Sequence, residues 1–428
     1  MKIAQFSDLH YANETLSEVD RCFAAAIERA IAWGAQAVVI SGDATDHRLD
    51  VHAPAFIALA RRIRQLSDHC PVLMLQGTYS HEPPGTLDIF RLVDGRHPVF
   101  VADRFCHVAL ASGAWQAFPG WCATEAELAS VAMAEALFTC VPTTNKAAIA
   151  ATVGATEAAE ALGEHLARLL RGYGVINQAA RAAGIPTVGV SHGTVSGCET
   201  EHGVPMMGLD HEFTTGALFS AQCSAFMLGH IHKMQAWERD GHRIAYPGSI
   251  GRLHYGEVDP KGCLLWNASA EGASFEFSET PARRMVHLEF TGLPEPEELE
   301  RVAKECAGAF VRVRWNVDEE HRNAVDRKSI ERILSEASEV KLEPHVVPSV
   351  RSRAEGMNRT QPMADKLKLW CAATDTPEDG LAERLSQVQV SDPAEIAARI
   401  IAGETAVACT EPFARAGADR QPFALSAR

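Results

Sequence analysis

Short apolar runs alternate with amphipathic stretches along the first part of the chain. Residues 1–7 alternate between apolar and polar positions, which is typical of a strand. Residues 16–33 place their apolar side chains at helical spacing, and 35–40 form a continuous apolar run typical of a buried parallel strand. A second helix over about 52–68 and a strand over 71–76 follow. This alternation predicts βαβ units in an α/β sandwich.

The pattern changes twice further along the chain. Short strands are expected between 96 and 122, whereas residues 123–184 are rich in alanine and predict a helical insertion. Strand-like runs then continue to about 280, which closes a first domain of 1–280. Beyond it, three strand-like runs and two helical stretches predict a small α+β capping domain over 281–375, and residues 376–428 predict a helical tail.

Composition limits the class of protein. Hydrophobic residues make up 46% of the chain, which is enough for a sizeable core, and no apolar run reaches the about 18 residues that span a bilayer. The 11 cysteines are scattered without a Cys-x-x-Cys pair, which favours reduced thiols over a disulfide framework. Without a targeting segment, we expect a cytoplasmic protein that does not bind membranes. The net charge of −15 argues weakly against purely electrostatic binding of nucleic acid.

Five polar clusters carry the candidate chemistry, each directly after a strand-like run. They are Asp8-Leu9-His10, Gly42-Asp43-Ala44-Thr45-Asp46, Ser80-His81-Glu82, Ser191-His192-Gly193 and Gly229-His230-Ile231-His232. Open α/β sheets bind ligands at the carboxyl ends of their strands, so we expect the clusters to meet at one edge. Carboxylates and imidazoles are ligands that suit Mn, Fe, Zn or Mg ions. The pattern therefore predicts a two-metal hydrolase.

Each cluster also has a simpler interpretation when it is taken alone. Asp8 and His10 share one face of an extended segment and could reach one metal, or they could be surface residues at the start of a loop. Asp43 could bridge two cations or cap the next helix, and Asp46 fits the capping role better, which leaves it outside the predicted ligands. His81 could donate a proton near neutral pH or belong to an ordinary polar turn. The repeated position after a strand favours the metal interpretation.

Together the clusters resemble the metallophosphoesterase (calcineurin-like) superfamily, whose pattern is D-x-H, G-D-x-x-D, G-N-H-[DE], a later His and G-H-x-H. The resemblance covers roughly residues 1–280 and implies a four-layer α/β/β/α metallophosphoesterase sandwich. It implies two divalent metal ions, with manganese favoured. By position, the implied ligands are Asp8, His10, Asp43 and His232 for one ion and Asp43, His192 and His230 for the other. It also implies that His81, oriented by Glu82, donates a proton or stabilises the transition state.

A narrower resemblance and one departure qualify this assignment. The stretch Tyr246-Pro247-Gly248-Ser249-Ile250 resembles the SbcD-type DNA repair exonucleases, which also carry a small capping domain. The superfamily places an Asn metal ligand immediately before the catalytic His, and here Ser80 stands in that position. The loop from Gly77 to His81 is also two residues longer. Because a hydroxyl is a poorer ligand than an amide oxygen, we expect Ser80 to hold the second metal weakly.

Three functions are compatible with this pattern. The first is a nuclease of SbcD type that processes DNA as an exonuclease or endonuclease, with an SMC-like coiled-coil ATPase as partner and a homodimer as a further expectation. Arg312-Val313-Arg314 and Arg351-Ser352-Arg353 are its candidate phosphate contacts, although alternating arginines usually form a solvated face. The second function is hydrolysis of small phosphoesters such as cyclic nucleotides. The third is a non-catalytic scaffold, which the nearly complete set of ligands disfavours.

Overall fold

The fold is described from a computed structural model, which describes residues 1–46, 49–50, 52–130, 133–143, 155–200, 212–321, 324–347, 357–358 and 360–401. Its contacts divide the chain into two units. One comprises Met1–Val317 and His321–Val346, and the other comprises Asp318–Glu320 and Val347–Arg428. All five polar clusters lie in the first unit.

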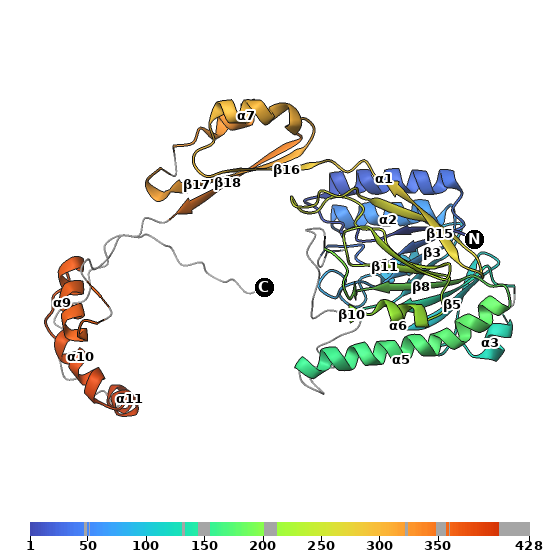
Figure 1. The fold of residues 1–428 in the computed structure, drawn as a ribbon, viewed down its shortest axis with the longest axis horizontal. Coiled ribbons are helices and arrows are strands. Elements are labelled where there is room, and N and C mark those ends of the chain that lie inside the picture. The colour runs from blue at the N-terminus through green and yellow to red at the C-terminus, as the bar shows by residue number, and fades with distance from the viewer. Residues whose placement is uncertain are drawn as a thin grey trace. The chain divides into compact units, whose positions relative to one another are not determined.

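Two stacked sheets form the centre of the first unit (Figure 1). The first sheet contains, in spatial order, β15 (Ala273–Glu279), β14 (Gly262–Ala268), β1 (Lys2–Phe6), β2 (Ala37–Ile40), β3 (Val72–Leu75) and β4 (Val99–Ala102). The second contains β12 (Gln235–Arg239), β13 (His242–Tyr246), β11 (Ala225–Gly229), β8 (Thr187–His192), β7 (Ala136–Val141), β5 (Cys106–Ala111) and β6 (Ala114–Ala117). Strands β1 to β4 are parallel, and so are β7, β8, β11 and β13. Parallel strands bring their carboxyl ends to one edge, which is where the polar clusters follow them.

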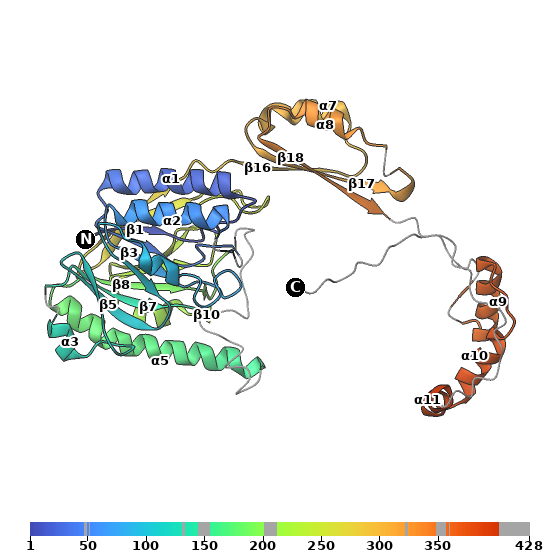
Figure 2. The same ribbon diagram turned by 180° about the vertical axis from the view of Figure 1, so that it is seen from behind.

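Helices cover the outer face of each sheet (Figures 1 and 2). On the first sheet lie α1 (Leu16–Trp33) and α2 (Pro54–Ser67), whose apolar stripes share one core with β1, β2 and β3. On the second lie α3 (Glu125–Ser130), α5 (Ala155–Ala182) and α6 (Thr215–Ser220). A short pair, β9 (Thr194–Val195) and β10 (Glu212–Phe213), follows β8 and precedes α6. The predicted four-layer α/β/β/α sandwich is confirmed.

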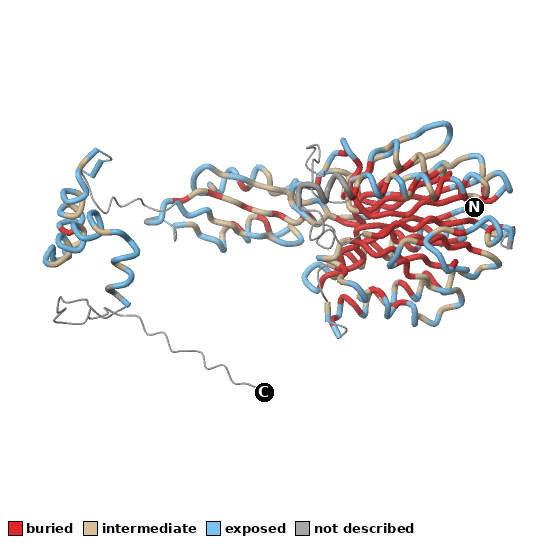
Figure 3. The backbone as a smooth tube through the Cα atoms, turned by 90° about the horizontal axis from the view of Figure 1, so that it is seen from below, coloured by how far each residue is buried: buried red, intermediate tan, exposed pale blue. Residues whose placement is uncertain are grey.

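The buried residues concentrate in the two sheets (Figure 3). Val39 and Leu73 of the first sheet pack against Val188 and Met227 of the second, and all four are inaccessible to solvent. Burying a side chain of this size contributes about 1.5–3 kcal/mol. Because both faces of these strands are covered, their sequences are continuously apolar, which explains why 35–40 was recognisable as a buried strand.

The prediction of a helical insertion over 123–184 is wrong in part, because a strand of the second sheet lies between the two helices α3 and α5. Residues Ala136–Val141 form β7, which pairs with β5 and β8 inside the second sheet. The strand is six residues long and buried throughout. A short apolar run has no periodicity that distinguishes a buried strand from part of a helix, and its alanine-rich surroundings favoured the helix. The helix α5 of this segment packs on the same sheet that β7 completes.

The predicted capping segment contains a three-stranded sheet with its own core. Its strands are β16 (Met285–Phe290), β17 (Phe310–Asp318) and β18 (Glu339–Val347), and its helices are α7 (Pro296–Ala303) and α8 (Arg327–Ile333). All five elements lie where the sequence predicts them. Elsewhere and within this segment, the chain also forms short 3₁₀ turns, at Asp88–Leu92, Lys304–Cys306 and Glu319–His321. The core of this segment is centred on Trp315, Val313 and Leu299.

The residues of the second unit that the structure describes form three α-helices. They are α9 (Met363–Thr374), α10 (Leu381–Val390) and α11 (Pro393–Ile401). The rest of the predicted tail, 402–428, lies outside the described residues, as does the Arg351-Ser352-Arg353 stretch. Within the described ranges, none of the helices combines the length with the apolar character needed to cross a lipid bilayer.

The imidazole of His107 on β5 is buried inside the second sheet and is held in its neutral form. Its Nδ1 accepts a hydrogen bond from the Ala123 N–H at 3.0 Å, and its Nε2 lies 3.1 Å from the Thr139 hydroxyl. Burial lowers the pKa of His107 to about 3, although a hydrogen bond with Asn177 acts in the opposite direction. Between about pH 6.5 and pH 3, His107 binds a proton in the unfolded chain but not in the folded protein. The folded state therefore loses stability as the pH falls through this range.

We expect the substitution His107→Gln to reduce the acid sensitivity of folding. For the unsubstituted protein, this one group lowers the free energy of unfolding by about 2 kcal/mol between pH 7 and pH 5. Glutamine does not titrate, so the variant should lack this contribution whatever its absolute stability. Urea denaturation at both pH values measures the difference, and an equal loss in the two proteins would contradict the prediction.

Candidate metal centre

Hydrogen bonds join the carboxyl ends of the two sheets and bring the polar clusters together. The backbone N–H of His230, after β11, donates to both carboxylate oxygens of Asp8 at 3.1 Å. The Gln5 amide on β1 donates to the Leu228 carbonyl at 2.9 Å. Between β8 and β2, Nδ1 of His192 lies 2.9 Å from the Ser41 carbonyl. Residues more than 150 positions apart in sequence therefore meet in one buried region.

Six of the seven predicted metal ligands fall into two compact groups. Asp8, His10 and His232 form the first group, and Asp43, His192 and His230 form the second. In the first, Nε2 of His10 and Nε2 of His232 are 3.2 Å apart, and Asp8 Oδ1 lies 3.9 and 3.8 Å from them. In the second, Nε2 of His192 lies 3.1 Å from Asp43 Oδ2. Within each group, carboxylate and imidazole atoms converge on a volume that one cation could occupy.

Four residues of these groups have a left-handed backbone, which is rare for residues other than glycine. The φ angles are +49° for Asp8, +47° for His10, +50° for Asp43 and +101° for His230. Non-glycine residues in such regions cost of order 1–3 kcal/mol each and persist where the surroundings impose them. Asp and His are the residue types that best tolerate this backbone. Predicted ligands therefore account for four of the eight described non-glycine residues with positive φ, which is typical of a functional site.

Two glycines allow the loops to approach each other closely. A Cβ atom on Gly42 would collide with the His192 imidazole, and Gly42 also has a φ of +102°. A Cβ atom on Gly77 would collide with the carboxylate of Asp43. Any side chain at these positions would therefore push a predicted ligand out of its group.

The electrostatics of both groups suit divalent cations. Burial lowers the pKa of His10 to about 4, so its imidazole is neutral at physiological pH and offers a lone pair. Burial also disfavours a charged His192, but the Asp43 carboxylate outweighs it and raises the pKa of His192 to about 10. Asp43 in turn has its pKa held far below the usual range by His192, against the effect of burial. Buried carboxylates thus favour positive charge here, and the donor sets fit two divalent metal ions.

Thr78, and not Ser80, lies beside the second group. The Thr78 hydroxyl is 3.1 Å from Asp43 Oδ2 and 3.2 Å from His192 Nε2, while its N–H donates to Asp43 Oδ1 at 2.6 Å. Ser80 is exposed in the turn that follows. The two extra residues of this loop therefore follow Thr78, and counting back from His81 selects a residue that lies in the exposed turn. The structure brings Thr78 to the second group in place of Ser80, and a ligand role for Thr78 stays a prediction.

The proposed proton donor His81 contacts Asp46, contrary to the expected role of Glu82. Nδ1 of His81 lies 2.9 Å from Asp46 Oδ1, and this hydrogen bond raises the pKa of His81. Glu82 is fully buried, and its carboxylate accepts hydrogen bonds from the N–H groups of Ala44 and Gly77, both at 2.6 Å. Asp46 does not cap the following helix, because Ala53 occupies the N-cap of α2. The carboxylate that orients His81 is therefore Asp46, and Glu82 holds two loops together.

Two residues of this centre were missed by the sequence analysis, and both had a signal. Asp46 is the last residue of the G-D-x-x-D pattern, and Thr78 directly follows the glycine of its cluster, as Asn does in the superfamily pattern. For Asp46 the capping role is the simpler interpretation, and for Thr78 the position immediately before His81 points to Ser80 instead. Asp8, His10, Asp43, His192, His230 and His232 are brought together as predicted, while their role as metal ligands stays a prediction.

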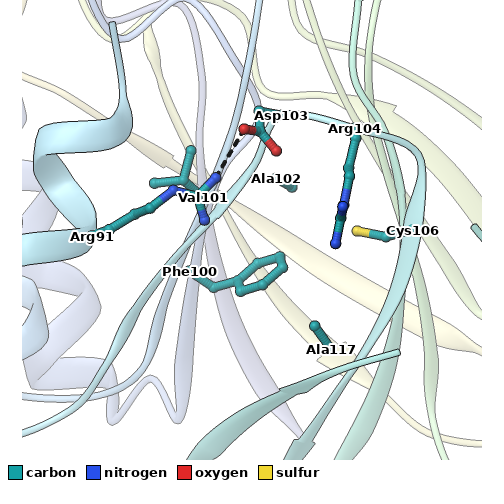
Figure 4. Close-up of a pocket in the computed structure, with 8 residues that line it drawn as sticks. All are labelled: Arg91, Phe100, Val101, Ala102, Asp103, Arg104, Cys106 and Ala117. Atoms are coloured by element: carbon teal, nitrogen blue, oxygen red, sulfur yellow. Dashed lines mark hydrogen bonds and ion pairs between the residues drawn. The ribbon is translucent and has the colours of Figure 1, made fainter. Parts of the chain in front are cut away.

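A separate pocket of about 230 Å³ lies where β4 ends and β5 begins (Figure 4). It is lined by an ion pair in which Arg91 and Asp103 are 3.0 Å apart, and by Arg104 and Cys106. None of the predicted ligands or His81 lines it. This pocket is therefore separate from the two groups of predicted ligands.

Comparisons with known proteins find weak similarity in fold to solved structures. No family model and no curated protein matches the chain. Among solved structures, it is similar to GAP50, the anchor in the inner membrane complex of Plasmodium, with a TM-score of 0.40 and 13% identity over 65% of this chain and 84% of that one. It is also similar to a dimetal phosphatase from Danio rerio, with a TM-score of 0.39 and 11% identity over 64% of this chain and 98% of that one. Similarity at this level does not identify the chemistry of the chain.

We expect Thr78→Val to weaken metal binding by the second group while Ser80→Ala leaves it unchanged. Valine keeps the shape of threonine and removes only the hydroxyl beside Asp43 and His192. Removing a polar contact that contributes about 1–1.5 kcal/mol raises the dissociation constant of the second metal-binding step roughly tenfold. Titration of the metal-free proteins with Mn²⁺ measures both steps. A weaker second step in Ser80→Ala, with an unchanged one in Thr78→Val, would restore the original assignment.

Proposed function

We propose that the chain is a two-metal phosphodiesterase of the metallophosphoesterase superfamily. The observation that carries the proposal is the convergence of two carboxylate–imidazole groups from four strand ends, with the His81–Asp46 pair beside them. Two bound divalent cations, with manganese favoured by the superfamily resemblance, would supply charge neutralisation for the phosphoryl group and a water of lowered pKa. The residues of the chain supply the positioning.

In the proposed reaction, His81 delivers a proton to the leaving oxygen. Its Nδ1 faces the Asp46 carboxylate, so a proton on Nε2 is the one available to a substrate. The carboxylate of Asp46 fixes the direction of the ring and favours the protonated imidazole. His10 lies next to His81, with the two ring centroids 4.7 Å apart, which places the proton donor directly beside the first group.

We propose DNA as the substrate, cleaved in the manner of an SbcD-type nuclease working with an SMC-like coiled-coil ATPase. The resemblance around Tyr246–Ile250 and the three-stranded capping segment support this proposal. One observation favours small phosphoesters instead. Arg314 pairs with Glu343 at 3.1 Å and Arg312 contacts the His287 ring, so two of the predicted phosphate contacts already have partners. DNA and small phosphodiesters must therefore be compared directly.

A nuclease assay on linear duplex DNA with Mn²⁺, beside bis(p-nitrophenyl) phosphate, separates these functions. We expect both substrates to be cleaved, and both activities to be lost in Asp43→Asn but kept in the matched surface variant Asp103→Asn. Hydrolysis of the small diester alone would favour the second function. If neither substrate is cleaved and less than one metal ion binds per chain, the protein is a scaffold.

We expect the effect of replacing His81 to depend on the leaving group. His81→Asn should lower kcat by about 10²–10⁴-fold on a substrate with a sugar leaving group, because general acid catalysis contributes about that much. The loss should be smaller with p-nitrophenolate, which leaves without a proton. Asp46→Asn should show the same dependence with a smaller loss, and His165→Asn on the exposed face of α5 serves as the control. Equal losses on both substrates would exclude His81 as the proton donor.

A further inference from the structure

A buried ion pair lies directly behind His232 of the first group. The side chains of Glu257 and Lys261 are each 0% exposed, and Lys261 Nζ donates to Glu257 Oε2 at 2.8 Å. The other oxygen, Oε1, lies 3.3 Å from Nδ1 of His232. Lys261 Nζ also donates to the His232 backbone carbonyl at 2.8 Å, so the pair holds both the ring and the main chain of this residue.

A buried pair of this kind is poorly explained by stability alone. Taking both charges out of water costs several kcal/mol per ion, and apolar residues of similar size are often as stable or more stable. Here the remaining hydrogen bonds of the pair are directed to the neighbourhood of the first group. Glu257 Oε2 accepts from the Leu253 N–H at 3.1 Å, which fixes the carboxylate in place. The geometry therefore serves the orientation of His232.

The contact with Glu257 determines which nitrogen of His232 can bind a metal. Since a carboxylate only accepts hydrogen bonds, Nδ1 of His232 must carry the proton and donate it to Glu257. In a neutral ring, Nε2 then has a free lone pair, and it is the atom 3.2 Å from His10 Nε2 and 3.8 Å from Asp8 Oδ1. Hydrogen bonding of the distal nitrogen to a carboxylate commonly fixes the tautomer and raises the basicity of metal-binding histidines.

We propose that Glu257, held by Lys261, is a positioning residue that presents Nε2 of His232 to a divalent cation in the first group. The proposal rests on the two-metal function proposed above and adds two residues to its machinery. Glu257 touches neither the cation nor a substrate, and it acts only through the ring of His232. Loss of such a partner typically weakens metal binding by about 10–100-fold.

The test uses Mn²⁺ titrations of the full-length chain, followed by electron paramagnetic resonance of the free ion. The binding step of the first group is identified as the one lost in His10→Asn. Glu257→Gln keeps the shape of the carboxylate but removes its charge. The double variant Glu257→Leu/Lys261→Met removes the whole pair without leaving an unpaired buried charge, so it should remain folded. Glu276→Gln, an exposed glutamate on β15, controls for the substitution itself.

We expect both Glu257 variants to weaken the first-group step by about 10–100-fold, with the second step and the Glu276→Gln protein unchanged. Nitrogen-15 NMR of the metal-free proteins should show His232 protonated at Nδ1 in the unsubstituted chain, and a mixture of tautomers in the double variant. A merely structural role would not change the tautomer. If the unsubstituted protein binds two ions and the variants bind them equally well, the positioning role is wrong and the proposed function stands. If the unsubstituted protein binds no Mn²⁺, both are overturned.

Discussion

The close approach of two sheets at the carboxyl ends of their strands is the constraint on which the rest of the structure depends. The Asp8 carboxylate after β1 accepts the His230 N–H after β11, and the Ser41 carbonyl after β2 meets the His192 ring at the end of β8. Each contact joins one sheet to the other. Without them the two metal groups could not form, because the first takes Asp8 from one sheet and His232 from the loop after a strand of the other.

This approach has an energetic cost, because it buries two carboxylates, and a backbone hydrogen bond and an ion pair offset that cost. Asp8 and Asp43 are 0% and 2% exposed, and an unpaired buried carboxylate is strongly unfavourable. The backbone N–H of His230 satisfies Asp8, whereas the protonated His192 ring balances Asp43. A bound cation would balance the charge of Asp43 in place of that proton. The left-handed backbone at Asp8, Asp43 and His230 adds strain to the same loops, so burial, charge and strain all concentrate where divalent ions would relieve them.

The sequence predicted most of this arrangement because the relevant signals are local. Apolar runs mark the strands, and the polar residues after them mark the shared edge, so six of the residues that meet there can be named without knowing how the sheets stack. The failures have a different origin. The strand β7 is a short apolar run whose partners β5 and β8 are distant in sequence, and pairing alone defines it. Thr78 and Asp46 owe their roles to neighbours reached through space, His192 and His81, which local spacing does not encode.

The buried carboxylate of Glu82 explains how the centre tolerates an unusually long loop. Glu82 joins the loop of Asp43 to the loop of Thr78 through the N–H groups of Ala44 and Gly77, so both ends are fixed independently of what lies between them. The residues inserted after Thr78 can then project outward, as the exposure of Ser80 indicates. Glu257 has a similar place on the other side of the centre, where its carboxylate contacts the His232 ring. Each group of predicted ligands therefore has a buried carboxylate beside it whose hydrogen bonds hold the surrounding loop or ring in place.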